Sequence, residues 1–363
     1  MATRLEGDLN RTRLSVLLGA QIEPSIFTLP DPYRVIIDLP NVLFHAEDQT
    51  GHPARGLVST YRYGLIAPGR SRIVIDTPGP VAVDSMKQSR TSDGIRLDID
   101  LVATSRDAFV KAATRQRAEV EVPPKPDAPT ADAGDKRPVI VIDPGHGGID
   151  MGAHGQDGEQ EKKVVLDFGL ALRAKLDATG RYRVVMTRDD DRFIALADRV
   201  RVAREAGAQL FVSIHADSIS DPFGVRGATV YTLSDRASDA EAEKLAEKEN
   251  RADVIAGVDL TSEPDEVAGI LIDLARRETK AFSARFAQNL VISVKGAVRL
   301  NKNPNRSAGF MVLKAPDVPS VLLELGYMSN RDDLKLLTSE EWRNTASGAM
   351  VAAVDRFFGY QKE

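Results

Sequence analysis

The first hundred residues alternate between apolar and polar positions over short stretches, and no helical period of useful length lies between them. Turn-forming Pro, Gly, Asp and Asn residues separate these stretches, which is typical of short β-strands. The clearest stretches are residues 13–18, 33–39, 71–77 and 95–102. The pattern predicts an all-β domain over residues 1–104, with the form of a small sandwich.

The composition changes over residues 105–137, which are rich in Pro, Ala and charged side chains and contain almost nothing to bury. We expect this segment to be a linker that is extended where its prolines cluster. The alternative is a structured strap that belongs to one of the domains.

The pattern of residues 138–363 alternates between strand and helix. Residues 139–143 form a continuous apolar run, which is typical of a strand covered on both faces. Apolar residues then recur at helical spacing from Val165 to Leu176. Repeated units of this kind predict an α/β fold, in which an open and mostly parallel sheet carries helices on both faces.

Composition and charge exclude several classes of protein. The apolar fraction of 42% and the charged fraction of 28% are those of a soluble globular protein. The net charge of −5 gives no general attraction to nucleic acid or to an anionic membrane. No apolar run approaches the roughly 18 residues that a membrane helix needs. The opening residues lack a signal-peptide pattern, which leaves export open because a mature form would have lost it.

The absence of cysteine limits the chemistry further. Disulfides, thiolate nucleophiles and cysteine-based zinc sites are all excluded. Any metal must therefore bind to histidines and carboxylates, and the chain has only five histidines.

Four side chains are expected at one edge of the predicted sheet, because ligands of such sheets bind outside the carboxyl ends of the strands. His146 lies three residues past Asp143, while His215 and Glu324 directly end two later apolar runs. Glu161 opens the helix that follows the first loop. Two imidazoles and two carboxylates from four separate segments therefore converge.

Two histidines and one carboxylate form a zinc ligand set that leaves a fourth position for water. A second carboxylate is then needed to move the proton of that water. The count fits His146, Glu161 and His215 as ligands and Glu324 as the base. Each element alone is weak evidence, because a glycine-rich loop more often cradles phosphate and a histidine at a strand end is more often structural.

His154 offers a different ligand set, since a site of three histidines is also chemically reasonable. It lies in a polar, glycine-rich loop with no element to fix its direction. We therefore expect His154 to be exposed or to line the substrate groove.

Several motifs resemble, in order and spacing, those of the zinc-dependent N-acetylmuramoyl-L-alanine amidases of bacterial cell walls. The likeness covers nearly all of residues 138–360 apart from one insertion, and its clearest segments are IDPGHGGIDMGAHG, LFVSIHAD and PSVLLELGYMSN. The resemblance implies that His146, Glu161 and His215 hold one zinc ion per chain and that Glu324 is catalytic. The first domain resembles, more loosely, the AMIN domain that places such amidases on the wall.

The resemblance implies hydrolysis of the amide bond between the lactyl group of muramic acid and L-alanine of the peptidoglycan stem peptide. It also implies a periplasmic location, because the substrate lies outside the cytoplasm, and we expect a monomer. The alternatives are a zinc peptidase or deacetylase that uses the same ligands, and a catalytically silent protein that only binds peptidoglycan.

The insertion, at about residues 233–297, resembles the segment found in amidases that act in septal wall splitting and daughter-cell separation. In that subgroup a helix covers the active site until a metal-free, peptidase-like activator of the LytM type moves it. We expect Glu263, Asp265 or Glu266 to approach the zinc in an autoinhibited resting state. Ile270, Leu271 and Leu274 form an apolar helical stripe that is a candidate activator contact. The alternative is a helix that faces the core.

Overall fold

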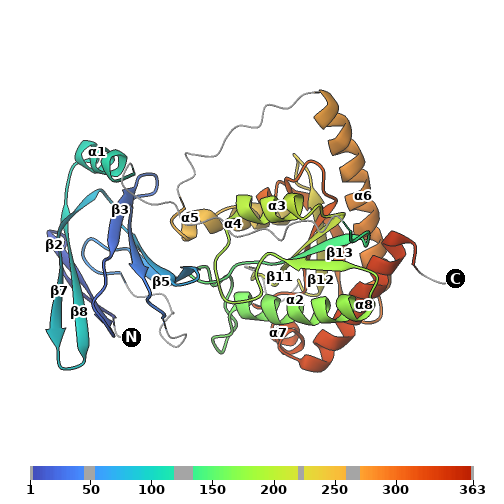
Figure 1. The fold of residues 1–363 in the computed structure, drawn as a ribbon, viewed down its shortest axis with the longest axis horizontal. Coiled ribbons are helices and arrows are strands. Elements are labelled where there is room, and N and C mark those ends of the chain that lie inside the picture. The colour runs from blue at the N-terminus through green and yellow to red at the C-terminus, as the bar shows by residue number, and fades with distance from the viewer. Residues whose placement is uncertain (1–2, 45–53, 118–133, 220–224, 259–269, 361–363) are drawn as a thin grey trace. The chain divides into compact units, whose positions relative to one another are not determined.

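The computed structural model describes residues 3–44, 54–117, 134–219, 225–258 and 270–360 (Figure 1). The chain divides into two compact units. The first consists of residues 1–124 together with residues 253–262, and the second contains the rest. Among the described residues, no helix is both long enough and apolar enough to cross a membrane.

The first unit contains two antiparallel sheets of four strands each, in the orders β1-β2-β8-β7 and β3-β4-β6-β5. Their buried side chains form one core, so the two sheets pack face to face as a sandwich. The predicted all-β fold is therefore confirmed. The strands are β1 (Thr3–Gly7), β2 (Arg11–Leu18), β3 (Ser25–Leu29), β4 (Arg34–Pro40), β5 (Thr60–Ala67), β6 (Arg70–Asp76), β7 (Val81–Thr91) and β8 (Gly94–Ala103).

Helix α1 (Arg106–Arg117) occupies the start of the segment predicted to be a linker. Phe109 of this helix is buried in the core of the sandwich, and its ring contacts the ring of Tyr33 edge-on, with 5.1 Å between the ring centroids. The expectation of a linker with almost nothing to bury is thus wrong for this part, because the ring of Phe109 packs a short helix against the sandwich. Residues 118–133 of the predicted linker lie outside the described residues.

The second unit is built on a six-stranded sheet in the order β10-β9-β11-β14-β12-β13. Neighbouring strands are parallel except for β12 and β14, which are antiparallel. The prediction of a mostly parallel sheet is confirmed. The strands are β9 (Val139–Pro144), β10 (Arg183–Met186), β11 (Leu210–His215), β12 (Ala228–Leu233), β13 (Leu300–Ala308) and β14 (Ser320–Glu324).

Helices cover both faces of this sheet, and each face has its own apolar core. Helices α2, α6 and α8 pack on one face, whereas α3 and α4 pack on the other (Figure 1). The sheet is therefore buried on both sides, as its continuous apolar strands require. The helices are α2 (Glu161–Ala178), α3 (Leu196–Glu205), α4 (Ala240–Glu249), α5 (Ala252–Ile255), α6 (Ile270–Val294), α7 (Arg331–Leu337) and α8 (Glu340–Phe358).

Leu172→Ala tests this packing, because Leu172 lies on α2 and is 1% exposed. The cavity should lower the free energy of unfolding by about 2–5 kcal/mol. The only tryptophan, Trp342, lies on α8 with its ring 6.1 Å from that of Phe168, so its fluorescence during urea unfolding reports on this unit. Lys163→Ala, at an exposed position on the same helix, should change the free energy by less than about 0.5 kcal/mol. If both substitutions lowered the free energy of unfolding equally, the assignment of Leu172 to the buried face of α2 and of Lys163 to its exposed face would be wrong.

Candidate metal centre and active site

The topology of the sheet places three of the predicted side chains at one edge. His215 is the last residue of β11 and Glu324 is the last residue of β14, and the two are paired in register. His146 follows the end of β9, the parallel neighbour of β11 on its other side. Parallel neighbours end at the same edge, so the three side chains meet there.

Glu161 is brought to this edge by the start of α2. The backbone N–H of Glu161 donates to the carbonyl of Ala153 at 2.9 Å, which folds the glycine-rich loop back onto the helix. Helix α2 has no side-chain N-cap, and a carboxylate in its first turn is favourable next to the positive end of the helix dipole. The side chain of Glu161 is fully buried.

Three possible ligand atoms converge in a buried cluster. Nε2 of His146 lies 3.1 Å from Oε1 of Glu161, and Nδ1 of His215 lies 3.4 Å from the same oxygen. The donor atoms of the three residues all lie within 4.8 Å of one another. Among the described residues, neither imidazole nitrogen has a hydrogen-bond partner. Unpaired buried polar atoms are costly, and a cation between them would remove that cost.

Hydrogen bonds fix the direction in which the side chains of His146 and Glu161 point. Nδ1 of His146 contacts Oδ2 of Asp150 at 2.8 Å, which leaves Nε2 to face the cluster. Oε1 of Glu161 accepts the backbone N–H of Ala216 at 2.8 Å, and Oε2 accepts that of Ala153 at 2.8 Å. The cluster is therefore rigid before any ion binds.

Two buried arginines hold the backbone of the loop that carries His146. Arg199 donates to the carbonyl of His146 at 2.7 Å and to Oδ1 of Asp143 at 2.8 Å. Arg188 donates to the carbonyl of Gly145 at 2.7 Å. His146 has a φ of +57°, which a residue with a Cβ rarely adopts, and these bonds stabilise that conformation. The sequence alone does not identify these two arginines, because nothing in their spacing distinguishes them from surface arginines.

Charge coupling shifts the pKa values of the cluster in opposite directions. Burial lowers the pKa of His146, but the carboxylates of Glu161, Asp150 and Glu249 outweigh it and raise this pKa well above its ordinary value. Burial raises the pKa of Glu161, but the two imidazoles outweigh it and hold that pKa well below its ordinary value. The site therefore favours ionised carboxylates beside positive charge.

The pKa of Glu324 is shifted in the opposite direction to that of Glu161. Burial, together with the nearby carboxylates of Glu161, Asp217 and Glu249, raises the pKa of Glu324 well above its ordinary value. Its Oε2 accepts the backbone N–H of Asp217 at 3.0 Å, while Oε1 has no hydrogen-bond partner among the described residues. A carboxyl group whose pKa is shifted toward neutral suits proton transfer in both directions.

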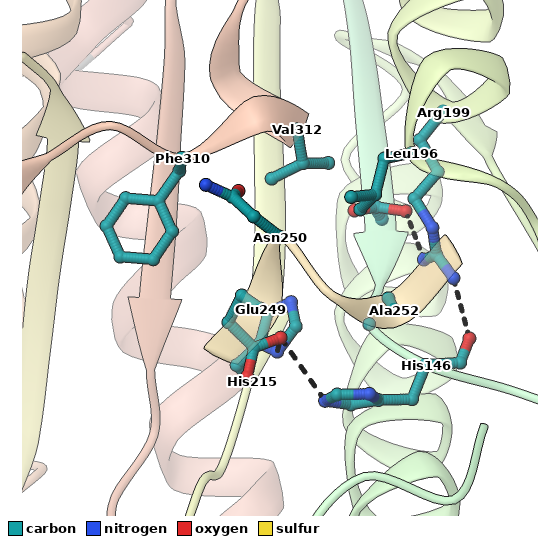
Figure 2. A pocket seen from close by; sticks show the side chains of 11 residues that line it. His146, Leu196, Arg199, His215, Glu249, Asn250, Ala252, Phe310 and Val312 are labelled. Atoms are coloured by element: carbon teal, nitrogen blue, oxygen red, sulfur yellow. Dashed lines mark hydrogen bonds and ion pairs between the residues drawn. The ribbon is translucent and has the colours of Figure 1, made fainter. Parts of the chain in front are cut away.

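A further carboxylate, that of Glu249 at the end of α4, lies against the two imidazoles. Its Oε2 is 3.2 Å from Nδ1 of His215 and 3.6 Å from Nε2 of His146 (Figure 2). The preceding residue, Lys248, forms an ion pair with Asp217, which lies two residues beyond His215. Helix α4 therefore reaches this site through two adjacent residues of opposite charge.

Sequence reasoning missed Glu249, although the pattern contained a signal for it. The buried residues of α4 are Ala242, Leu245, Ala246 and Glu249. This is the spacing i, i+3, i+4, i+7 of an apolar stripe, with a glutamate in the last position. A carboxylate on the buried face of a helix needs a partner, so the pattern points to a buried cationic group or a functional site.

The other predicted site residues are not all described. Glu263, Asp265 and Glu266, expected near the metal, lie outside the described residues. Ile270, Leu271 and Leu274 lie on α6, where the structure describes the backbone but not these side chains. His154 is exposed, as expected, and is not part of the cluster.

Comparison with known proteins gives two family matches. The N-acetylmuramoyl-L-alanine amidase family matches residues 140–356, and the AMIN domain matches residues 3–101.

Individual relatives show the same likeness. The N-acetylmuramoyl-L-alanine amidase AmiC of Neisseria meningitidis is 32% identical over 374 residues, which cover 98% of this chain and 89% of the relative. The amidase AmiA of Escherichia coli is 40% identical over 227 residues, which cover 62% of this chain and 78% of the relative. A solved structure, the amidase AmiC2 of Nostoc punctiforme, is 28% identical, with a TM-score of 0.44, and covers 62% of this chain and 99% of its own.

Gly145→Ala tests how closely the loop approaches the cluster, because a Cβ at this position would lie 2.3 Å from Cε1 of His215. The clash should lower the free energy of unfolding by about 1–3 kcal/mol, measured by Trp342 fluorescence in urea. The control is Gly348→Ala on α8, where an added Cβ has no neighbour within 4 Å. That change should raise the free energy by about 0.5–1 kcal/mol, since alanine favours a helix. Equal stabilities of the two variants would rule out the close contact.

Proposed function

The chain belongs to the N-acetylmuramoyl-L-alanine amidase family, and we propose that this peptidoglycan amidase uses a zinc ion held by His146, Glu161 and His215. The observation that carries the proposal is the buried cluster itself. Its two imidazole nitrogens have no hydrogen-bond partner among the described residues, and both face the same carboxylate oxygen. A donor set of two histidines and one carboxylate, without cysteine, is that of catalytic zinc sites with an open position.

The bond to be cleaved is the amide between the lactyl group of N-acetylmuramic acid and L-alanine of the stem peptide. Zinc, when bound, polarises a carbonyl oxygen and lowers the pKa of a coordinated water to about 7. The remaining steps are proton transfers by the protein. Glu324 accepts a proton from the attacking water and delivers it to the nitrogen of the departing L-alanine. Its free Oε1 and its raised pKa suit both transfers.

The loop backbone supports this chemistry by holding His146 in place. Asp150 keeps Nδ1 of His146 occupied, and Arg199 holds the carbonyl of the same residue. An imidazole fixed at both its ring and its backbone loses little entropy when it binds a metal.

The resting enzyme is autoinhibited by Glu249. A carboxylate oxygen that lies 3.2 Å from one possible ligand and 3.6 Å from another competes for the position that a water molecule or the substrate carbonyl would need. The ion pair of Lys248 with Asp217 supports the same placement of α4. The earlier candidates Glu263, Asp265 and Glu266 stay predictions, since they lie outside the described residues.

Activation then requires α4 to move away from the cluster. A metal-free, peptidase-like protein of the LytM type is the expected activator, and Ile270, Leu271 and Leu274 are its candidate contacts. Control of this kind suits a periplasmic enzyme that splits the septal wall, because uncontrolled hydrolysis would damage the wall elsewhere.

Metal analysis and product analysis together test the catalytic assignment. Purified protein should contain about one zinc ion per chain, and His215→Ala should lose most of it, because two donors hold zinc poorly. Glu324→Gln should keep the zinc but release stem peptides beginning with L-alanine about 10²–10⁴-fold more slowly. Release of acetate instead of peptides would indicate a deacetylase. Full activity of the Glu324 variant would remove that residue from the mechanism.

Glu249→Gln tests autoinhibition, because it keeps the size of the side chain and removes the charge that competes at the cluster. Hydrolysis of purified sacculi without activator should rise at least about tenfold. The matched control is Glu247→Gln, at an exposed position on the same helix, which should behave as the wild type. A rise produced only by replacing Glu263, Asp265 and Glu266 together would transfer the inhibitory role to that segment.

A further inference from the structure

The outer face of the sheet β3-β4-β6-β5 is buried, although one side of an antiparallel sheet usually faces water. Side chains of β4 alternate, so Val35 and Ile37 enter the sandwich core while Arg34 and Ile36 point to the other side. Arg34 is nevertheless only 4% exposed and Ile36 is fully buried. Arg72 of β6 is 5% exposed. Arginines are almost never this buried without a partner, so another segment covers this face.

The covering segment is residues 253–258, which belong to the same compact unit as the sheet. Arg34 donates to the carbonyl of Val254 at 2.6 Å, and Arg62 donates to that of Ile255 at 2.6 Å. Arg72 donates to the carbonyls of Ala256 and Gly257 at 3.2 and 3.0 Å. Three strands thus supply donors to four consecutive carbonyls at the end of α5, where backbone carbonyls have few partners inside the helix.

The sheet holds two of these arginines ready for the segment. Arg72 forms a bidentate pair with Asp38, with distances of 2.6 and 2.9 Å, and Arg62 forms an ion pair with Asp76. Charged donors fixed by carboxylates in this way lose little entropy when they bind carbonyls.

Gly257 shows that the segment fits closely against the sheet. Its φ is +67°, and a Cβ at this position would lie 2.5 Å from Cδ1 of Ile36. Only glycine combines this backbone conformation with so close an approach.

We propose that this sheet face is a docking surface for residues 253–258 and that the docked segment restrains the inhibitory helix α4. The second part rests on the proposed inhibition by Glu249. Asp253 follows Glu249 by four residues, and four residues span at most about 14 Å even when fully extended. Glu249 can therefore move away from the cluster by more than this span only if the segment leaves the sheet or the N-terminal domain moves with it. The N-terminal domain therefore takes part in regulation as well as in the placement on the wall that its resemblance implies.

The test disturbs docking from each side in the full-length, zinc-loaded protein. Gly257→Val blocks the close approach without changing the sheet, and Arg62→Leu removes one donor without changing the segment. In both variants, hydrogen exchange of the amides of residues 253–258 should become faster. Hydrolysis of sacculi without activator should rise at least about fivefold, the lower end of measured coupling between sites. The control is Arg96→Leu, an exposed arginine on β8 of the other sheet, which should change neither readout.

The outcomes separate this proposal from the one on which it rests. Unchanged exchange in both variants would show that the segment is not docked, and would overturn the proposal. Faster exchange with unchanged hydrolysis, while Glu249→Gln still activates, would disprove the restraint and leave autoinhibition intact. If Glu249→Gln does not raise hydrolysis, the proposed inhibition by Glu249 is wrong, and the proposed restraint of α4 is wrong as well. The hydrogen-exchange data alone then decide whether the sheet face is a docking surface.

Discussion

The catalytic unit depends on an excess of negative charge that is buried at one edge of its sheet. Glu161, Glu324, Asp217 and Glu249 have little or no contact with solvent, so it is costly to ionise all four together. Carboxylates in such a cluster raise one another's pKa unless a cation lies among them. Burial raises the pKa of Glu324, and the repulsion from Glu161, Asp217 and Glu249 raises it further. A divalent cation is the simplest partner for the arrangement, and a raised pKa is what the proposed proton transfer by Glu324 needs.

Rigidity makes this concentration of charge possible. The edge is formed by parallel strands whose ends cannot shift independently, and His215 and Glu324 are fixed by their pairing in register. Arg188 and Arg199 hold the loop of His146 through its carbonyl groups. Most of the polar groups around the site are therefore satisfied by backbone and neighbouring side chains, while the atoms left unpaired face the centre. That contrast distinguishes a binding site from an imperfect core.

The proposed inhibition by Glu249 depends on the same cluster as the proposed catalysis. Glu249 approaches the imidazoles because the cluster attracts an oxygen donor, so an internal carboxylate can take the place of water or substrate. The segment that follows is held by arginines on backbone carbonyls, an interaction that depends on shape rather than on a particular sequence of side chains.

The order of apolar and polar residues predicts the strands, the helices and the two kinds of fold. It also predicts the convergence of His146, Glu161, His215 and Glu324, because strand ends in a parallel sheet share an edge. The sequence does not show that Phe109 packs helix α1 against the sandwich, because a single apolar residue gives no helical or strand periodicity. It also did not identify Arg188, Arg199 and Glu249, whose roles depend on partners distant in the chain. These roles follow from the folded chain, since the partner of a buried charge is set by packing rather than by its sequence neighbours.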